Sequence, residues 1–420
     1  MVAAGIEAMN VYGGLAYLDV FKLFAYRGLD TARFDNLMMK QKTVALPFED
    51  PITFGVNAAK PIVDALSEEE RNRIELLITC TESGIDFGKS ISTYLHHYLG
   101  LNRHCRLFEI KNACYSGTAG LQTAISYILS QASPGSKALV VATDISRMMA
   151  VDPGAALDWD MAFTEPSSGA GAVAMLVSDR PHIFQIDVGA SGFYGYEVMD
   201  TCRPVPDCDA GNADLSLMSY LDCCEQTFLA YRDKVADVDY RDTFHYLAFH
   251  TPFGGMVKGA HRSMMRKMTK TPTDRIDADF EARVRPSLQY CQRVGNIMGA
   301  TTMLALASTI DHGQFDTPKR IGCFSYGSGC CSEFFSGVVT EEGQRRLRQM
   351  RIADGVGERR ELTMEQYARV IEQSGAVKFG TRNVELDWRL LPEVTATRGG
   401  RPTLALRGIK EFHREYGWLS

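Results

Sequence analysis

The stretch 106–131, RLFEIKNACYSGTAGLQTAISYILSQ, constrains the fold most, because an extended apolar run passes within a few residues into an apolar helix. The spacing of apolar residues predicts a helix that begins at Cys114 and is buried on most of its circumference. Unpaired backbone N–H groups and the helix dipole favour a thiolate at such a position. The pattern is typical of a nucleophilic cysteine, but an inert cysteine in the core would produce it too.

Nearly continuous apolar runs elsewhere predict strands that are buried on both faces, with helices between them. The first half carries them in IELLITC, SKALVVATDIS and SSGAGAVAMLVSD, and the second half in TFHYLAFHTP and KRIGCFSYGSGCCSEFFSGVV. The two halves resemble each other, so the sequence predicts an α/β protein built from a duplicated unit, divided into residues 1–190 and 191–420. Residues 193–214, with their prolines and aspartates, are expected to form a surface excursion.

Composition excludes several classes of protein. A chain of 420 residues with 45% hydrophobic and 23% charged residues can bury a large core, and its net charge of −6 argues against a general nucleic-acid binder. The eleven cysteines form no CxxC pair, and no apolar run reaches about 18 residues, so neither a metal site nor a membrane span is expected. An odd cysteine count without a signal-like start indicates a reduced, cytoplasmic protein.

Three further places carry residues suited to chemistry. Glu82 follows an apolar strand, where a partly desolvated carboxylate can act as a base, although a helix cap or a surface residue would look alike. His250 ends another strand beside a glycine-rich turn. Asn296 lies between glycines, and the 325–329 turn, with Ser325 and Gly327, offers backbone N–H donors, which alone is a weak signal.

Cysteine, histidine and asparagine in this order are typical of several acyl-transfer enzymes, in which histidine moves protons and an amide steadies an oxygen. Cysteine peptidases share the order, and the spacing of 136 residues from Cys114 to His250 would suit the papain range. The peptidase signature around the cysteine is absent, however, and the cysteine lies far from the N-terminus. The missing signature and the position of the cysteine therefore favour acyl transfer over proteolysis.

Five blocks together resemble a known family. These are TES at Glu82, KNACYSGTAG, HTPFGGMVKGAH, GNIMGA and SYGSGC, which are similar in sequence and order to the 3-hydroxy-3-methylglutaryl-CoA (HMG-CoA) synthases of the thiolase superfamily. Segments 27–51 and 277–300 resemble most the bacterial synthases of polyketide β-branching cassettes, which act on acyl-carrier-protein thioesters. Ser116 is a departure, because synthases of primary metabolism usually have glycine after the tyrosine.

The resemblance implies the thiolase fold, in which two α/β halves form five layers (αβαβα), usually in a homodimer. It implies that Cys114 accepts acetyl from a donor carrier protein, that Glu82 removes a methyl proton, and that backbone N–H groups of Cys114 and of the turn at Ser325 hold the enolate. His250 would protonate the alkoxide formed on the β-ketone of a second, carrier-bound substrate, while Asn296 orients that acceptor. Hydrolysis would release the product, with no metal or organic cofactor.

Three alternatives remain open. The first is an HMG-CoA synthase of primary metabolism, which uses acetyl-CoA and acetoacetyl-CoA. The second is a condensing enzyme like ketoacyl-carrier-protein synthase III, which makes its nucleophile by decarboxylation and needs no base at Glu82. The third is an inactive module that binds carrier proteins, for which the intact motifs are poor support. Whether Glu82 faces Cys114 separates an HMG synthase from the second alternative.

Lys258, Arg262 and Arg266 recur every four residues on the helix predicted after His250, so they share one face. Carrier proteins are typically acidic and present their cargo on a phosphopantetheine arm. A basic face near the site would steer such a partner and hold the phosphate. An ordinary solvated helix face would show the same pattern.

Overall fold

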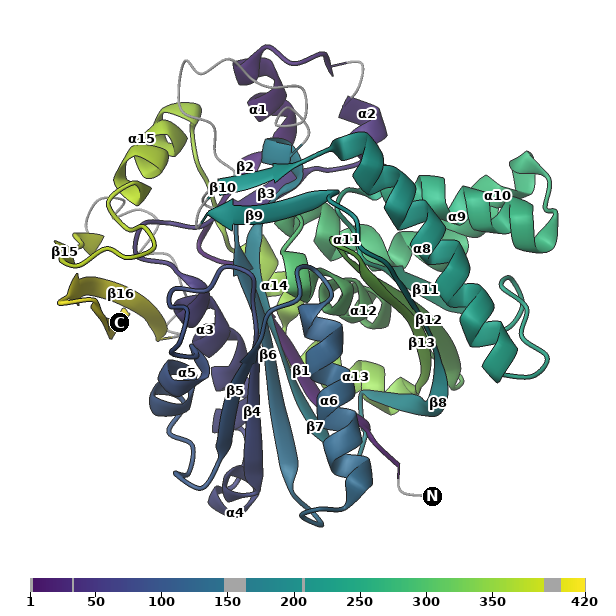
Figure 1. The fold of residues 1–420 in the computed structure, drawn as a ribbon, viewed down its shortest axis with the longest axis horizontal. Helices are drawn as coiled ribbons and strands as arrows, with labels where there is room; N and C mark the ends of the chain where they lie inside the picture. The colour runs from purple at the N-terminus through teal and green to yellow at the C-terminus, as the bar shows by residue number, and fades with distance from the viewer. Residues whose placement is uncertain (1–2, 32–33, 147–163, 206–207, 389–401, 420) are drawn as a thin grey trace.

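The structure is a computed structural model that describes residues 3–31, 34–146, 164–205, 208–388 and 402–419. Its centre is a nine-stranded sheet in the order β11-β12-β13-β8-β1-β7-β6-β4-β5 (Figure 1). The first-half strands are β1 (Gly5–Tyr12), β4 (Ile74–Cys80), β5 (Arg106–Ile110), β6 (Lys137–Ile145) and β7 (Ala170–Ser178). The second-half strands are β8 (Phe184–Gly195), β11 (Tyr246–Phe249), β12 (Lys319–Gly327) and β13 (Cys331–Val339).

The topology confirms the predicted duplication. In the first half β4 runs parallel to β6, and β7 lies antiparallel between β6 and β1. In the second half β11 runs parallel to β12, and β13 lies antiparallel between β12 and β8. The two half-sheets join where β1 meets β8, through the pairs Gly5–Gln185 and Ile6–Phe184.

Helices complete the five layers. Helices α6 (Ser116–Ser130) and α12 (Thr301–His312) form the middle layer, and their apolar residues share one buried cluster with strands of both half-sheets. Helix α3 (Pro51–Asp64) covers the outer face of the first half-sheet, and α8 (Ala213–Lys234) with α9 (Gly254–Thr269) covers that of the second (Figure 1). In both halves the parallel strands end at the level where α6 and α12 begin.

Local sequence explains the start of α3 and the placement of α6. Asp50 accepts a hydrogen bond from Thr53 N, Thr53 Oγ1 accepts one from Asp50 N, and Pro51 occupies the first turn, so α3 begins with a complete capping box. Helix α6 has no side-chain cap. A side chain at Gly117 would lie 2.1 Å from Gly299 O, so only glycine lets α6 pack against the loop before α12.

Smaller elements surround the core. In the first half they are β2 (Ala16–Asp19), α1 (Val20–Arg27), α2 (Phe34–Leu37), β3 (Gln41–Val44), α4 (Glu68–Asn72) and α5 (Ser92–Tyr98). The middle of the chain adds β9 (Thr201–Val205), β10 (Cys208–Gly211), α10 (Thr273–Asp279), η3 (Phe280–Val284), α11 (Arg285–Val294) and η4 (Met298–Ala300). The C-terminal part adds α13 (Glu341–Gln349), α14 (Ile352–Gly357), β14 (Arg360–Glu361), α15 (Met364–Ser374), β15 (Val384–Glu385), β16 (Thr403–Lys410) and β17 (His413–Leu419).

The chain organisation differs from the expectation in one segment. The surface excursion predicted at 193–214 is wrong in part, because β8 extends to Gly195, β9 pairs antiparallel with β10, and Asp200 is fully buried. The division after residue 190 stays a prediction. It falls inside β8, and β14 of the C-terminal part pairs with β2 of the N-terminal part. Within the described ranges, no helix is both long and apolar enough to cross a bilayer.

Candidate active site

Asp144, at the end of β6, organises the strand ends around Glu82. Its Oδ1 atom accepts hydrogen bonds from Thr81 Oγ1, Glu82 N and Ser83 N at 2.9–3.0 Å, and Oδ2 accepts one from Gly299 N at 3.1 Å. The carboxyl group is fully buried, and this burial raises its pKa although the hydrogen bonds oppose the shift. Asp144 therefore ties the turn that carries Glu82 to the loop before α12.

Glu82 is held by an arginine from the β9–β10 hairpin. Arg203 Nη1 donates to Glu82 O at 2.8 Å, and Nη2 lies 3.6 Å from Glu82 Oε1. Both side chains are about one-fifth exposed. The arginine therefore fixes the position of a carboxylate, a group that can act as a base.

Cys114 lies in the tight turn between β5 and α6. Ala113, just before it, has a left-handed backbone with φ of 43°, and Tyr115 N, just after it, donates to Asn112 O at 3.1 Å. A left-handed conformation is unfavourable for a residue with a Cβ atom, by about 1–2 kcal/mol. The turn is thus a constrained one that presents the cysteine, as turns around nucleophiles often are.

The thiolate expected at Cys114 is contradicted. Helix α6 begins at Ser116, two residues beyond the cysteine, so Cys114 is not its first residue. Burial, followed by the negative charges of Glu82 and Asp144, holds the pKa of the Cys114 thiol well above its ordinary value, against a smaller opposing effect of Arg203. Cys114 is a thiol at neutral pH, and the charge of Glu82 acts directly on it. Glu82 and Cys114 therefore share one site.

His250 follows β11 and belongs to the same strand-end level. Its backbone N donates to Phe324 O at 2.7 Å, which places it beside Ser325 of β12, and Tyr220 Oη donates to its carbonyl at 2.7 Å. The imidazole is buried, and its Nδ1 has no hydrogen-bond partner within the described ranges. Burial lowers the pKa of His250 to about 3, so the ring is neutral at physiological pH.

Asn296 lies in the loop before α12. Its Oδ1 accepts hydrogen bonds from Met298 N at 3.0 Å and Thr301 Oγ1 at 2.8 Å, which fixes the orientation of the amide. The side chain is partly exposed, and its Nδ2 donates to no other residue that the structure describes. An immobilised amide of this kind can orient a carbonyl oxygen.

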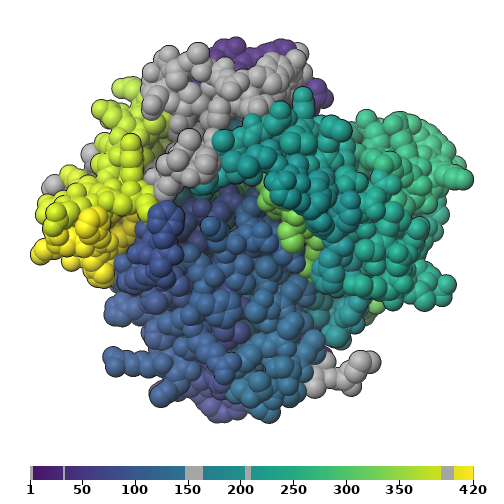
Figure 2. All heavy atoms as spheres, in the orientation of Figure 1, coloured from purple at the N-terminus to yellow at the C-terminus, as the bar shows by residue number. Residues whose placement is uncertain are grey.

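The loop after β12 approaches Cys114 from the second half. Ser325 lies inside β12, is fully buried, and accepts a hydrogen bond from Thr118 Oγ1 of α6 at 2.8 Å. Gly327 ends the strand, and a side chain there would lie 2.6 Å from Tyr115 N. The turn therefore begins only after Gly327, and this glycine brings the second half against the nucleophile. Figure 2 shows the seam on the surface, where blue residues meet teal ones with green residues between them.

Comparison with known families decides which one uses such a site. The sequence model described as hydroxymethylglutaryl-coenzyme A synthase N terminal matches residues 2–181, and its C terminal counterpart matches residues 263–385. The chain belongs to the hydroxymethylglutaryl-CoA synthase family. It is 66% identical over 420 residues, 100% of both chains, to the polyketide biosynthesis 3-hydroxy-3-methylglutaryl-ACP synthase PksG of Bacillus subtilis (strain 168).

Other members of the synthase family match at lower sequence identity. The hydroxymethylglutaryl-CoA synthase of Enterococcus faecalis is 32% identical over 369 residues, which cover 86% of this chain and 90% of that one. The crystal structure of the curacin biosynthetic pathway HMG synthase in complex with acetyl donor-ACP matches with a TM-score of 0.95 and 62% identity, over 99% of this chain and 100% of that one. The predicted family and the thiolase fold are confirmed.

Three side chains at this synthase site were missed in the sequence. Asp144 could have been noticed as an aspartate that ends an apolar strand. Arg203 gave no signal, because it lies 121 residues from Glu82 in a segment expected to be an excursion. Asp200, in the same segment, accepts hydrogen bonds from Tyr326 Oη at 2.5 Å and Gly329 N at 2.8 Å, and so joins the segment to the turn after β12.

The predicted basic face lies on α9, but Asp277 of α10 partly neutralises it. Lys258 and Arg262 approach Asp277 of α10 at 3.2 Å and 3.5 Å, and Arg266 donates to Thr273 Oγ1 at 3.3 Å. These three side chains form a rim on α9, the helix that follows His250. Their role in binding stays a prediction.

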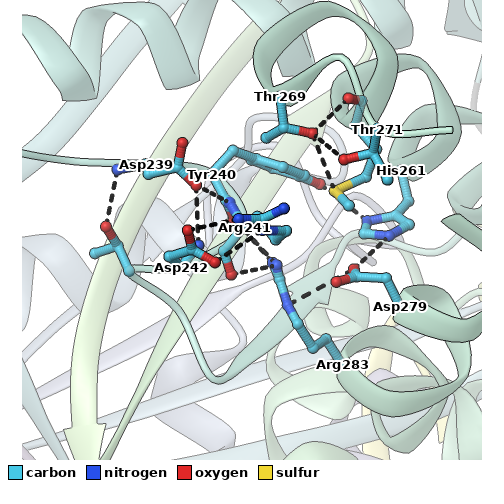
Figure 3. A network of polar contacts seen from close by, with 11 residues as sticks. Asp239, Tyr240, Arg241, Asp242, His261, Thr269, Thr271, Asp279 and Arg283 are labelled. Atoms are coloured by element: carbon cyan, nitrogen blue, oxygen red, sulfur yellow. Dashed lines mark hydrogen bonds and ion pairs between the residues drawn. The ribbon is translucent and has the colours of Figure 1, made fainter. Parts of the chain in front are cut away.

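A second histidine fixes α9 from its buried side. His261 Nε2 lies 2.9 Å from Asp279 Oδ1, its Nδ1 lies 3.2 Å from Tyr240 Oη, and Arg283 donates to Tyr240 O at 2.8 Å (Figure 3). This network ties α9 to α10 and η3. Within the described part of the chain, no group of three or more His, Cys, Asp or Glu residues could hold a metal ion.

The burial of His250 yields a test of its charge. In a nitrogen-15 NMR titration, the His250 ring, assigned with the His250→Gln variant, should keep the neutral pattern from pH 5 to pH 8, because its pKa is about 3. The same ring in the urea-unfolded protein should titrate near 6.5. A midpoint near 6.5 in the folded protein would show that the ring is open to water and would contradict the site as described.

Proposed function

We propose that the chain is an HMG synthase of polyketide β-branching, which adds a Cys114-bound acetyl group to the β-ketone of a carrier-bound polyketide and hydrolyses the product from the enzyme. The observation that supports the proposal is that Glu82 lies near enough to the Cys114 thiol for its charge to raise the pKa of the thiol. The 66% identity to PksG, named as a polyketide HMG-ACP synthase, supports carrier-bound rather than CoA-bound substrates.

Acetylation of Cys114 comes first. The thiol sulfur attacks the acetyl carbonyl of a donor carrier protein, a carbon–sulfur bond forms, and the pantetheine thiolate leaves. The cysteine proton must reach that leaving sulfur, because Cys114 starts as a thiol. Neutral His250 can relay the proton, since one imidazole nitrogen accepts while the other donates.

Carbon–carbon bond formation follows. Glu82 removes a methyl proton from the acetyl group, and backbone N–H groups of Cys114 and of the strand end at Gly327 stabilise the enolate oxygen. The enolate carbon attacks the acceptor ketone, and His250 donates a proton to the new alkoxide, which is basic enough to take it from a neutral ring. Asn296 orients the acceptor. The proton on Glu82 then returns to His250. Water attacks the Cys114 thioester carbonyl, the Cys114 sulfur leaves and takes up a proton to restore the thiol, and the product carries a free carboxylate.

The alternatives receive less support. A ketoacyl-synthase-like enzyme would need no carboxylate at Cys114, yet Glu82 is there with Arg203 holding it. An HMG-CoA synthase of primary metabolism would use the same residues, but the E. faecalis enzyme of that name is only 32% identical. The proposed reaction uses side chains and backbone alone and requires no metal or organic cofactor. A cytoplasmic homodimer stays a prediction.

Two variants separate nucleophile from base. Cys114→Ala should stay folded and gain no acetyl mass when incubated with acetylated carrier protein. Glu82→Gln should acetylate on Cys114 but fail to exchange deuterium from solvent into the acetyl methyl group, because an amide cannot remove the proton. Intact-protein mass spectrometry follows both events.

The control is Cys105→Ala, because Cys105 is a partly exposed thiol outside the site and should leave acetylation unchanged. Acetylation of the Cys114→Ala variant at another cysteine would disprove the assignment of Cys114 as the nucleophile. Exchange that persists in Glu82→Gln would assign the base elsewhere.

The rim on α9 generates a test of partner binding. Lys258→Glu and Arg266→Glu should raise KM for carrier-bound acetyl, more at low salt than at high salt, while acetylation from a small acetyl thioester stays nearly unchanged. Arg382→Glu is the matched control, since this exposed arginine is also ion-paired, with Glu411, and lies near β15 on the opposite side of Figure 1 from α9. Equal losses with both substrates would show that the rim is structural.

A further inference from the structure

Glu333 is a buried carboxylate on β13 that reaches the turn of the nucleophile from the second half. It is fully buried, although its strand belongs to the half-sheet opposite Cys114. Its Oε2 accepts a hydrogen bond from Tyr115 Oη at 2.7 Å, and its Oε1 accepts one from Gln122 Nε2 at 2.6 Å. Tyr115 directly precedes α6, and Gln122 lies in its second turn.

Tyr115 is the residue through which Glu333 can act on Cys114. It follows the cysteine directly and precedes the first residue of α6, where no side chain caps the helix. On the other side of the cysteine, Ala113 has an unfavourable left-handed backbone. A turn with these properties relaxes unless its neighbours hold it. The hydrogen bond from the Tyr115 phenol to Glu333 restrains the turn, and so does the close packing of Gly327 against Tyr115.

The ionised carboxylate is unfavourable for folding. Burial, opposed by the bonds from Tyr115 and Gln122 and by the charge of Lys234, raises the pKa of Glu333 to about 7. Its other titratable neighbours are Cys331 on the same strand and Cys323 on β12. An unfolded glutamate ionises near 4.3, so the native state loses stability as pH rises from about 4.5 through 7. Glutamine would fill the same space without this loss.

We propose that Glu333 is a positioning residue for acetyl transfer, which holds Tyr115 and thereby keeps the Cys114 turn in the conformation that attacks the donor thioester. The inference rests on the proposed role of Cys114 as the acetylated nucleophile. Carboxylate acceptors make stronger hydrogen bonds than neutral ones, which is the reason for a carboxylate at a position where glutamine would be more stable. The residue acts through Tyr115 and touches no reacting atom.

The test compares Glu333→Gln, Tyr115→Phe and the double variant by the rate of Cys114 acetylation at pH 8 and by Tm. Each single variant should slow acetylation at saturating donor by roughly tenfold, the loss expected for one charge-assisted hydrogen bond, with KM unchanged. The double variant should be no slower than the slower single one, because both remove the same bond. Glu333→Gln should keep or raise Tm at pH 8 while it slows acetylation.

Tyr231→Phe is the matched control. Tyr231 shares a 2.8 Å hydrogen bond with Ser336, also on β13, but lies on α8 in the outer layer. The Tyr231→Phe variant should become acetylated on Cys114 at the wild-type rate. The inference would be overturned if Glu333→Gln and Tyr115→Phe acetylate at the wild-type rate, or if their rates fall only as Tm falls. The proposed function would still hold in that case, provided that the wild-type protein is acetylated on Cys114. Absence of acetyl on Cys114 in the wild type would overturn the proposed function instead.

Discussion

The site depends on the buried carboxylate of Asp144. One oxygen of this group accepts hydrogen bonds from the turn that carries Glu82, and the other accepts one from Gly299 in the loop that carries Asn296. The bonds connect a strand end of the first half with a loop of the second. Each buried donor left without an acceptor would cost about 1–3 kcal/mol. The hydrogen bonds of Asp144 therefore fix the position of Glu82 relative to Asn296. Glu333 makes a comparable connection on the far side of Cys114, through Tyr115 and Gln122.

Burial also sets the resting charge of the site. It raises the pKa of Cys114 and lowers that of His250, so both groups rest in their neutral forms. The carboxylate of Glu82 rests beside Arg203. A neutral nucleophile next to a negative base does not react until a thioester carbonyl arrives and a proton can move. This arrangement protects the free enzyme, because no idle thiolate is available for side reactions before the donor binds.

Much of the fold and part of the site could be predicted from sequence, for physical reasons. Strands buried on both faces give continuous apolar runs, and a polar residue that ends such a run, such as Glu82 or His250, stands out. The charge state of Cys114 could not be predicted, because it depends on which carboxylates the fold brings near the thiol. Glu333 could not be found either. It lies 218 residues from Tyr115, and only the antiparallel pairing of β13 with β12 brings it to the nucleophile.

The central claim is that Glu82 and Cys114 form one acetyl-processing site, with Arg203 holding the base. A crystal structure of the protein acetylated on Cys114 tests it most directly. We predict that a Glu82 carboxylate oxygen lies within about 3–3.5 Å of the acetyl methyl carbon, the separation needed for proton removal, with Arg203 still bound to Glu82. An acetyl group that points away from Glu82, with another side chain at its methyl carbon, would contradict the account.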